Sequence, residues 1–282
     1  MTADRVLRVG HSPDPDDAFM FYALIRGKVT LPGFGFRDVV EPIEELNRRA
    51  LGGELEVTAL SAHAFARCAD RYRILSAGAS VGRGYGPLLV ARAARSLASL
   101  AGRPVALPGE LTTAALVARL VLPDAAFVQV RFDEIPAAVL AGRVEAGVII
   151  HEGQLTWQSL GLARLLDFGE WWAGQTGGLP LPLGLDAVRA DLGEEAARAM
   201  DRALKASIAY AFDHPADAMA YARGFGRGID EATNDAFVRM YVNQDTRALP
   251  PDCLQALDEL YRRAAAAGLL AAVPAVRVVD GG

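Results

Sequence analysis

The sequence of 282 residues lacks the features that mark several classes of protein. Its two cysteines, Cys68 and Cys253, lie far apart and without metal-ligand spacing, which indicates neither a disulfide scaffold nor a zinc site. No apolar run is both long enough and free enough of charge to cross a membrane. The opening segment MTADRVLRVG leaves no room for a signal peptide, so we expect a cytoplasmic protein if the chain is complete.

A surplus of one charge is also lacking. The 29 basic and 34 acidic residues are interspersed and give a net charge of -5, so no basic stripe is available for a phosphate backbone and nucleic acid is not expected as a partner. The chain has no Gly-x-Ser-x-Gly elbow, P-loop, His-Glu-x-x-His or Cys-x-x-Cys motif. The glycines of GRGYG, residues 82–86, precede a strand-like segment rather than a helix, which favours a turn over a dinucleotide loop.

What the sequence has is 52% hydrophobic residues, arranged as short apolar runs that alternate with helix-period segments. This rhythm predicts βαβ winding in residues 1–93 and again in residues 94–187. Residues 188–282 are predicted to form helices and no strands. Because such a segment cannot form an α/β sheet of its own, we expect it to complete the first lobe. Two extended segments, 85–92 and 178–193, are interpreted as crossings between the lobes. The sequence therefore predicts an α/β fold of two lobes with a ligand cleft between them.

The first polar cluster, HSPDPDD, begins at His11 between an apolar strand and an apolar helix. Asp14 or Asp16 is placed to accept backbone N–H bonds at the helix start, and Asp17 favours its positive end. A metal site is the alternative, but it needs further carboxylates or histidines that no spacing brings here. We therefore predict a helix cap and no metal, with His11 and Ser12 facing the cleft.

Two further clusters follow predicted strands. Ser61 ends the segment VTALS and can cap the next helix or, with nearby backbone N–H groups, hold an anion. His63 lies one turn into that helix and is interpreted as a half-buried, hydrogen-bonded histidine rather than a ligand. Thr112 and Thr113 follow a Pro-Gly turn in which Gly109 allows close backbone approach. Their paired hydroxyls suit a carboxylate, and simple capping of the helix is the alternative.

The fourth cluster is His151 and Glu152 in VEAGVIIHEGQLTW, directly after an apolar stretch that predicts a buried strand. Histidine exchanges a proton near neutral pH without special tuning, so an imidazole at this strand end is a candidate general base. A structural histidine bonded to a carbonyl group is the alternative. Glu152 is interpreted as an orienting or capping group.

Several segments, in this order, resemble the 1,4-dihydroxy-6-naphthoate synthase family of menaquinone biosynthesis: SPDPDDAFMFYAL, EELNRRALGGELEVTALS, PGELTTA, EAGVIIHEGQLTW, LPLPLG and YVN. The resemblance covers nearly the whole chain and implies a two-lobed fold like that of type II periplasmic-binding proteins. It also implies a carbon–carbon lyase that cleaves cyclic dehypoxanthinyl futalosine. The implied products are 1,4-dihydroxy-6-naphthoate and a three-carbon dihydroxyacetone unit, formed without a metal or organic cofactor.

The resemblance also implies roles for individual residues. The proton acceptor falls on His151. The substrate-binding residues expected from position and resemblance together are Ala59, Leu60, Ser61, Thr112, Thr113, Ser12 and Asp14. The implied partner is a small aromatic carboxylate, and we expect no membrane partner and a monomer or homodimer.

The chain departs from the family pattern in two places. It has SPDPDD where many members have Ser-Pro-Cys-Pro-Asn-Asp, and Ala59 where a lysine stands two residues before the serine. Both changes lie at the expected cleft, so they bear on the substrate rather than on the fold. Chorismate dehydratase, a sister branch, and a non-catalytic carboxylate-binding protein of the same fold are the alternatives. The IIHE segment and the missing export signal favour the synthase.

Overall fold

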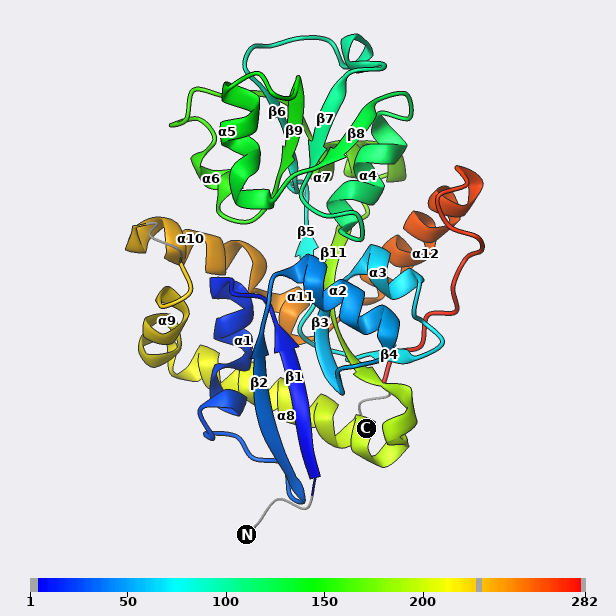
Figure 1. Cartoon of the computed structure of the whole chain (residues 1–282). Coiled ribbons are helices and arrows are strands. Elements are labelled where there is room, and N and C mark those ends of the chain that lie inside the picture. Colours follow the sequence, from blue (N-terminus) through cyan, green and yellow to red (C-terminus); the bar gives the residue numbers. More distant parts are fainter. Residues whose placement is uncertain (1–4, 227–229, 280–282) are drawn as a thin grey trace. The chain divides into compact units, whose positions relative to one another are not determined.

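The computed structural model describes residues 5–226 and 230–279, and the chain forms two compact units (Figure 1). Unit 1 contains the residues up to Val81, Gly184–Pro251 and the residues from Pro274 on. Unit 2 contains Gly82–Leu183 and Asp252–Val273. Within the described residues, no helix is long and apolar enough to cross a membrane.

Unit 1 is built on a mixed sheet with the strand order β2-β1-β3-β11-β4, and β5 also pairs with β11. The strands are β1 (Arg5–His11), β2 (Phe34–Val40), β3 (Val57–Ser61), β4 (Tyr72–Ile74), β5 (Ser80–Gly82) and β11 (Leu181–Arg189). β1 runs parallel to β2 and β3, whereas β11 runs antiparallel to β3 and β4. The carboxyl ends of β1 and β3, with His11 and Ser61, therefore lie at the same edge of the sheet.

Helices cover both faces of this sheet. They are α1 (Pro15–Ile25), α2 (Ile43–Gly52), α3 (Ala62–Ala66), α8 (Glu194–Asp213), α9 (Pro215–Arg223), α10 (Glu231–Tyr241) and α11 (Gln244–Arg247). Leu7 and Val9 of β1 share a core with α1 and α8, whereas a Cβ at Gly10 would lie 2.9 Å from Leu46 of α2. Because side chains alternate along a strand, α1 and α8 cover one face and α2 covers the other, as Figure 1 shows.

Helix α1 is buried along nearly its whole length because α8, α9 and α10 pack against it. Ser207 of α8 joins α8 to α1. Its hydroxyl donates to the Met20 carbonyl at 2.7 Å and accepts the Leu24 N–H at 3.2 Å. The start of α1 is thereby held at the carboxyl end of β1, where the first polar cluster lies.

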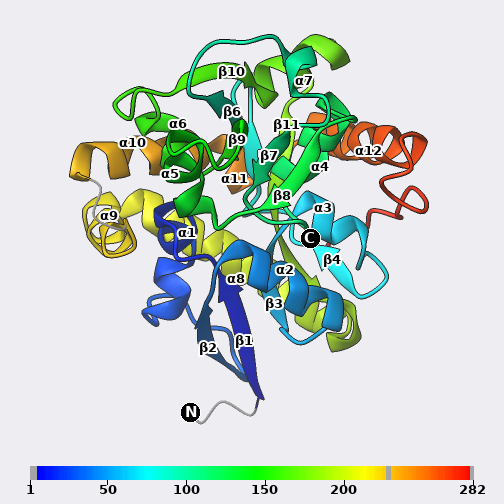
Figure 2. The ribbon, with the colours of Figure 1, turned by 45° about the horizontal axis from the view of Figure 1, so that its top comes forward.

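Unit 2 has its own sheet, in the order β10-β6-β9-β7-β8. Its elements are β6 (Leu88–Ala91), β7 (Pro104–Leu107), β8 (Ala126–Gln129), β9 (Ala146–Ile149), β10 (Ala163–Asp167), α4 (Thr113–Val121), α5 (Ile135–Leu140), α6 (Gly153–Thr156), α7 (Phe168–Thr176) and α12 (Pro251–Ala266). A Cβ at Gly147 of β9 would lie 2.4 Å from Ile135, so α5 packs closely on one face. Figures 1 and 2 show α4 on the other side of these strands.

The observed units differ from the lobe boundaries expected from the sequence. β6 is not a crossing but a central strand of unit 2, paired with β9 and β10. Helix α12 belongs to unit 2 although it follows the helices of unit 1. Contacts with unit 2 hold it there: the Arg263 guanidinium lies over the buried Trp172 ring at 5.4 Å and donates to the Gln175 carbonyl at 2.8 Å, and Arg83 pairs with Asp252 at 2.8 Å. Residues 252–273 therefore do not complete the first lobe.

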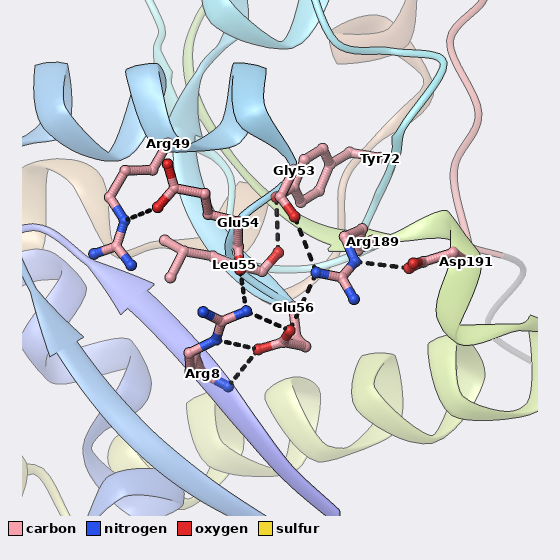
Figure 3. Close-up of polar contacts among 9 residues, drawn as sticks. All are labelled: Arg8, Arg49, Gly53, Glu54, Leu55, Glu56, Tyr72, Arg189 and Asp191. Carbon is pink, nitrogen blue, oxygen red and sulfur yellow. Dashed lines mark hydrogen bonds and ion pairs between the residues drawn. The ribbon is translucent and has the colours of Figure 1, made fainter.

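The amino ends of β1 and β3 in unit 1 carry a paired charge network, which we call the basal network: Arg8, Glu56, Arg189 and Asp191 (Figure 3). Both Glu56 carboxylate oxygens accept from the Arg8 guanidinium at 2.8 Å, and Arg189 lies 3.1 Å from the same carboxylate. Arg189 also pairs with Asp191 at 2.7 Å. The Arg8 bond lowers the pKa of Glu56 to about 2, despite partial burial.

Candidate functional site

The aspartates at the start of α1 are buried and organise the turn that precedes the helix. Asp14 occupies the N-cap position, but its side chain makes no capping bond. Its Oδ2 instead accepts the Ser12 hydroxyl proton at 2.6 Å, and Asp17 Oδ2 accepts the Ser12 backbone N–H at 2.8 Å. The capping bond expected from Asp14 is therefore not formed, and both carboxylates fix Ser12 at the strand end.

Burial changes the acidity of this group. It raises the pKa of Asp16 well above the usual range, and the carboxyls of Asp17 and Asp14 raise it further. Burial also raises the pKa of Asp17, although the positive charge of His11 and the Ser12 N–H act in the opposite direction. These carboxyls hold their protons to higher pH than exposed aspartates do.

The sequence predicts that His11 faces the ligand cleft, but in the structure this residue supports the turn before α1. The residue has no exposed surface, and its ring stacks on Phe21 with the centroids 5.5 Å apart. Nδ1 lies 2.8 Å from the Ser12 carbonyl oxygen and Nε2 lies 3.1 Å from Asp38 Oδ1. Burial lowers the pKa of His11, but the bond to Asp38 and the charge of Asp17 outweigh it, so the pKa is raised.

Ala59, Leu60 and Ser61 end β3, and all three are buried. Ser61 N donates to Asn47 Oδ1 at 2.8 Å, and its hydroxyl accepts from Asn47 Nδ2 at 3.0 Å. Ser61 makes no side-chain capping bond to α3, a helix of five residues. Ser61 is thus held by α2, and Leu60 points to the opposite face of the sheet from its two neighbours.

Asp186 of β11 lies directly opposite Ala59 in the strand pairing, so the two side chains are neighbours on the face that α1 covers. Asp186 is 1% exposed, and its Oδ2 accepts no hydrogen bond within the described residues. Burial raises its pKa well above the usual range, and the charges of Asp17 and Asp16 raise it further. We call Asp14, Asp16, Asp17 and Asp186 the acidic cluster.

In unit 2, Thr112 and Thr113 begin α4 as expected, and both are buried. Thr112 is the N-cap: its hydroxyl accepts the Ala115 N–H at 3.1 Å and donates to the Gly109 carbonyl at 2.9 Å. The Thr113 hydroxyl donates to the Leu183 carbonyl at 2.7 Å. Capping is therefore realised, while the first turn of α4 still presents backbone N–H groups that the helix itself cannot bind.

His151 follows β9 and is half-buried. It has a φ of 56°, and no other non-glycine residue of the described chain has a positive φ. Its carbonyl accepts the Gln154 N–H at 3.0 Å, which starts the turn into α6. Its ring meets the Phe132 ring edge-to-face with the centroids 4.8 Å apart. Phe132 thus orients an imidazole that the backbone holds in a strained region.

Sequence reasoning missed Asn47, Asp38, Phe132 and Asp186. Two of them carried a usable signal: Asn47 is polar on the apolar face of a helix, and Asp186 is the one acid in the apolar run LPLGLDAV. His63 is buried and accepts from Arg67 at 3.3 Å, as a hydrogen-bonded histidine does. In the part of the chain that is described, no group of three or more His, Cys, Asp or Glu residues is arranged to hold a metal ion.

Comparison with known proteins adds three kinds of finding. The model of a family described as "Menaquinone biosynthesis" matches residues 7–266. A 1,4-dihydroxy-6-naphthoate synthase of Thermus thermophilus is 43% identical over 268 residues, covering 95% of this chain and 97% of the relative. The synthase of the same name from Streptomyces coelicolor is 39% identical over 280 residues, covering 97% of each chain.

Solved structures agree with these sequence relatives. A crystal structure of a protein from Archaeoglobus fulgidus has a TM-score of 0.89 and 48% identity, and covers 94% of this chain and 98% of its own. A Candida albicans protein described as having the generic periplasmic-binding-protein fold has a TM-score of 0.67 and 14% identity, and covers 94% and 91%. The second likeness concerns the fold alone and confirms the expected periplasmic-binding-protein-like α/β fold.

Proposed function

The chain belongs to the menaquinone-biosynthesis family, and from this premise we propose that it is a 1,4-dihydroxy-6-naphthoate synthase acting as a carbon–carbon lyase. The substrate is cyclic dehypoxanthinyl futalosine, and the products are 1,4-dihydroxy-6-naphthoate and dihydroxyacetone. The names of the curated relatives indicate an enzyme. The proposal goes further, because it names the substrate and the type of bond that is cleaved.

His151 is the proton acceptor in this proposal. It takes a proton from the substrate as the carbon–carbon bond breaks in a retro-aldol-like step. The observation that supports this role is the positive φ of His151. Holding a non-glycine residue in the left-handed region costs of the order of 1 kcal/mol or more of folding free energy. A glycine would relieve this cost, so the imidazole is retained for its chemistry.

The substrate carboxylate binds at the start of α4. The N-terminal turn of a helix carries partial positive charge and orphan N–H groups, which favour an anion. Thr112 fixes this turn through its capping bond, and Thr113 is fixed by its bond to Leu183. Ser61, held by Asn47, and Ser12, held by Asp14 and Asp17, are the remaining polar contacts we assign to substrate.

The test uses three forms of the protein: wild type, His151→Asn and His151→Gly. Both replacements tolerate a positive φ, so both should fold with unchanged or higher thermal stability. We expect turnover of cyclic dehypoxanthinyl futalosine to fall about 10²–10⁴-fold in each. Added imidazole should restore part of the turnover in His151→Gly, which has room for it, but not in His151→Asn.

Two results would reject the proposal in different ways. Near-normal single-turnover cleavage by folded His151→Gly would remove this residue from the proton transfer. Dehydration of chorismate by the wild type, with no cleavage of cyclic dehypoxanthinyl futalosine, would assign the chain to the other step of the pathway. Binding of either compound without turnover would make it a carboxylate receptor.

A further inference from the structure

The acidic cluster contains two carboxyl oxygens that the described part of the chain leaves without a hydrogen-bond partner. They are Asp186 Oδ2 and Asp16 Oδ1, on residues that are 1% and 7% exposed. A buried polar oxygen without a partner costs free energy, so proteins rarely keep one without a use. Neither oxygen is needed for the turn before α1, which Asp14 and Asp17 already fix.

Asp201, another buried aspartate of unit 1, shows what a structural carboxylate looks like. It is 0% exposed, accepts from the Ser76 N–H at 2.6 Å and from the Ser76 hydroxyl at 2.9 Å, and lies 2.9 Å from Lys205. Asp186 has none of these partners. Asp201 is thus paired where it stabilises the fold, whereas Asp186, near the carboxyl ends of β1 and β3, has a carboxyl oxygen without a partner.

The position of Asp186 is nevertheless fixed. Its Oδ2 lies so close to the Gly78 backbone that a Cβ on Gly78 would be 2.0 Å away. Gly78 has a φ of +90°, and its N–H is bound by the Thr246 carbonyl at 2.7 Å. A glycine at this point lets the carboxyl lie against the chain on the α1 side of the sheet.

We propose that Asp186 and Asp16 form a subsite of unit 1 that binds hydroxyl groups of a small organic ligand. An anion is disfavoured there because Asp14 and Asp17 already bring carboxylates to the same place. A hydroxyl donates to a carboxylate and accepts from a protonated carboxyl, so it suits the cluster in either state. The choice of ligand rests on the proposed function: the three-carbon part of the substrate, released as dihydroxyacetone, bears such hydroxyls, whereas the naphthoate part brings the carboxylate.

The experiment measures binding in the His151→Asn background, so that the substrate is not consumed. Asp186→Leu keeps the branching of the side chain and removes both hydrogen-bonding atoms, and we expect about 10-fold weaker binding of cyclic dehypoxanthinyl futalosine. Asp186→Asn keeps a donor and an acceptor, so affinity should stay within about 3-fold. Affinity for 1,4-dihydroxy-6-naphthoate, which lacks the three-carbon hydroxyls, should not change in either variant.

Asp186→Ala provides an independent variant if the leucine protein does not fold. The alanine variant should weaken substrate binding as the leucine variant does. Asp201→Asn is the matched control, because it alters a buried aspartate of the same unit outside the subsite and should leave both affinities unchanged. Equal loss of substrate and naphthoate binding in the Asp186 variants would mean a structural role and would overturn the subsite, as would unchanged binding of both.

A separate measurement keeps this inference apart from the proposed function. Ligand-observed NMR with dihydroxyacetone reports on the subsite even if the wild type does not cleave cyclic dehypoxanthinyl futalosine. Binding to the wild type that is lost in Asp186→Ala supports the subsite whatever the turnover assay shows. Absence of binding to the wild type, or binding that survives in Asp186→Ala, overturns it.

Discussion

Carboxyl groups at the two ends of the same strands in unit 1 have opposite surroundings and opposite pKa shifts. At the amino ends of β1 and β3, Glu56 of the basal network is bound by Arg8 and Arg189 (Figure 3). At their carboxyl ends, the acidic cluster brings Asp186 close to Asp16 and Asp17, and burial and these two carboxyls raise its pKa without an arginine or lysine to oppose them. The pKa of Glu56 is lowered and that of Asp186 is raised.

This difference indicates that one end of the sheet serves stability and the other serves ligand binding. A carboxylate with a lowered pKa stabilises the folded state above the pH at which the unfolded chain ionises. A buried carboxyl with a raised pKa destabilises the folded state as pH rises, because the unfolded chain ionises first. The basal network therefore supports the fold, whereas the acidic cluster costs stability and is retained for what it binds.

The largest expected effect is at Glu56. Glu56→Gln keeps the size of the side chain but removes the charge that two arginines bind. It should lower the free energy of unfolding at pH 7 by about 1–2 kcal/mol, because solvent around the partly exposed Arg8 screens the interaction that lowers the pKa of Glu56. Urea unfolding followed by circular dichroism measures this change. The wild type should lose the same contribution as pH falls from about 5 toward about 2, while Glu56→Gln should show a flatter profile over that window.

Gln158→Glu is a suitable control, since it changes one charge at an exposed position of unit 2 and should have little effect on either measurement. If Glu56→Gln unfolded at the same urea concentration as the wild type at pH 7, the basal network would not be a stabilising feature. The contrast between the two ends of β1 would then lose its energetic basis.

The second effect is smaller and has the opposite sign. Asp186→Asn replaces a carboxyl whose ionisation burial disfavours by a neutral group of the same shape, so at pH 7 to 8 the protein should gain about 1 kcal/mol of stability. The gain should shrink toward pH 4, where the unfolded chain also holds the proton. A thermal-melting series over pH 4 to 8 measures this, and a loss of stability at pH 8 would show that Asp186 is a paired structural group.

Much of this organisation could be predicted from the sequence, because it follows from local pattern. The alternation of apolar runs and helix-period segments predicted two α/β units, and the strand-end position of His151 and the helix start at Thr113 follow from short-range signals. The membership of α12 in unit 2 could not be predicted, because it depends on the contact of Arg263 with Trp172, ninety-one positions earlier in the chain.

In the candidate site, too, the sequence predicts some features and not others. Ser12, Ser61 and Thr112 lie at element ends that the sequence marks, but their partners come from elsewhere in the fold. Asn47 reaches Ser61 across the pairing of α2 with β3, and Asp186 faces Ala59 only because β11 returns antiparallel to β3. Such contacts depend on strand order and register, which local periodicity does not encode.

The smallest expected effect is that of metal removal, and it could break the comparison outright. A divalent cation bound among Asp14, Asp16, Asp17 and Asp186 would pair these carboxylates as fully as the arginines pair Glu56. The side chains are not arranged for this: Asp14 and Asp17 are directed at Ser12, and no set of three acidic, histidine or cysteine ligands converges within the described residues. Hard cations such as Ca²⁺ and Mg²⁺ require about six or more oxygen ligands, most of them supplied by the protein or by water. We therefore expect EDTA to leave both turnover and melting temperature unchanged, whereas loss of turnover that Mg²⁺ or Ca²⁺ restores would show that the acidic cluster is paired after all, by a cation in place of an arginine.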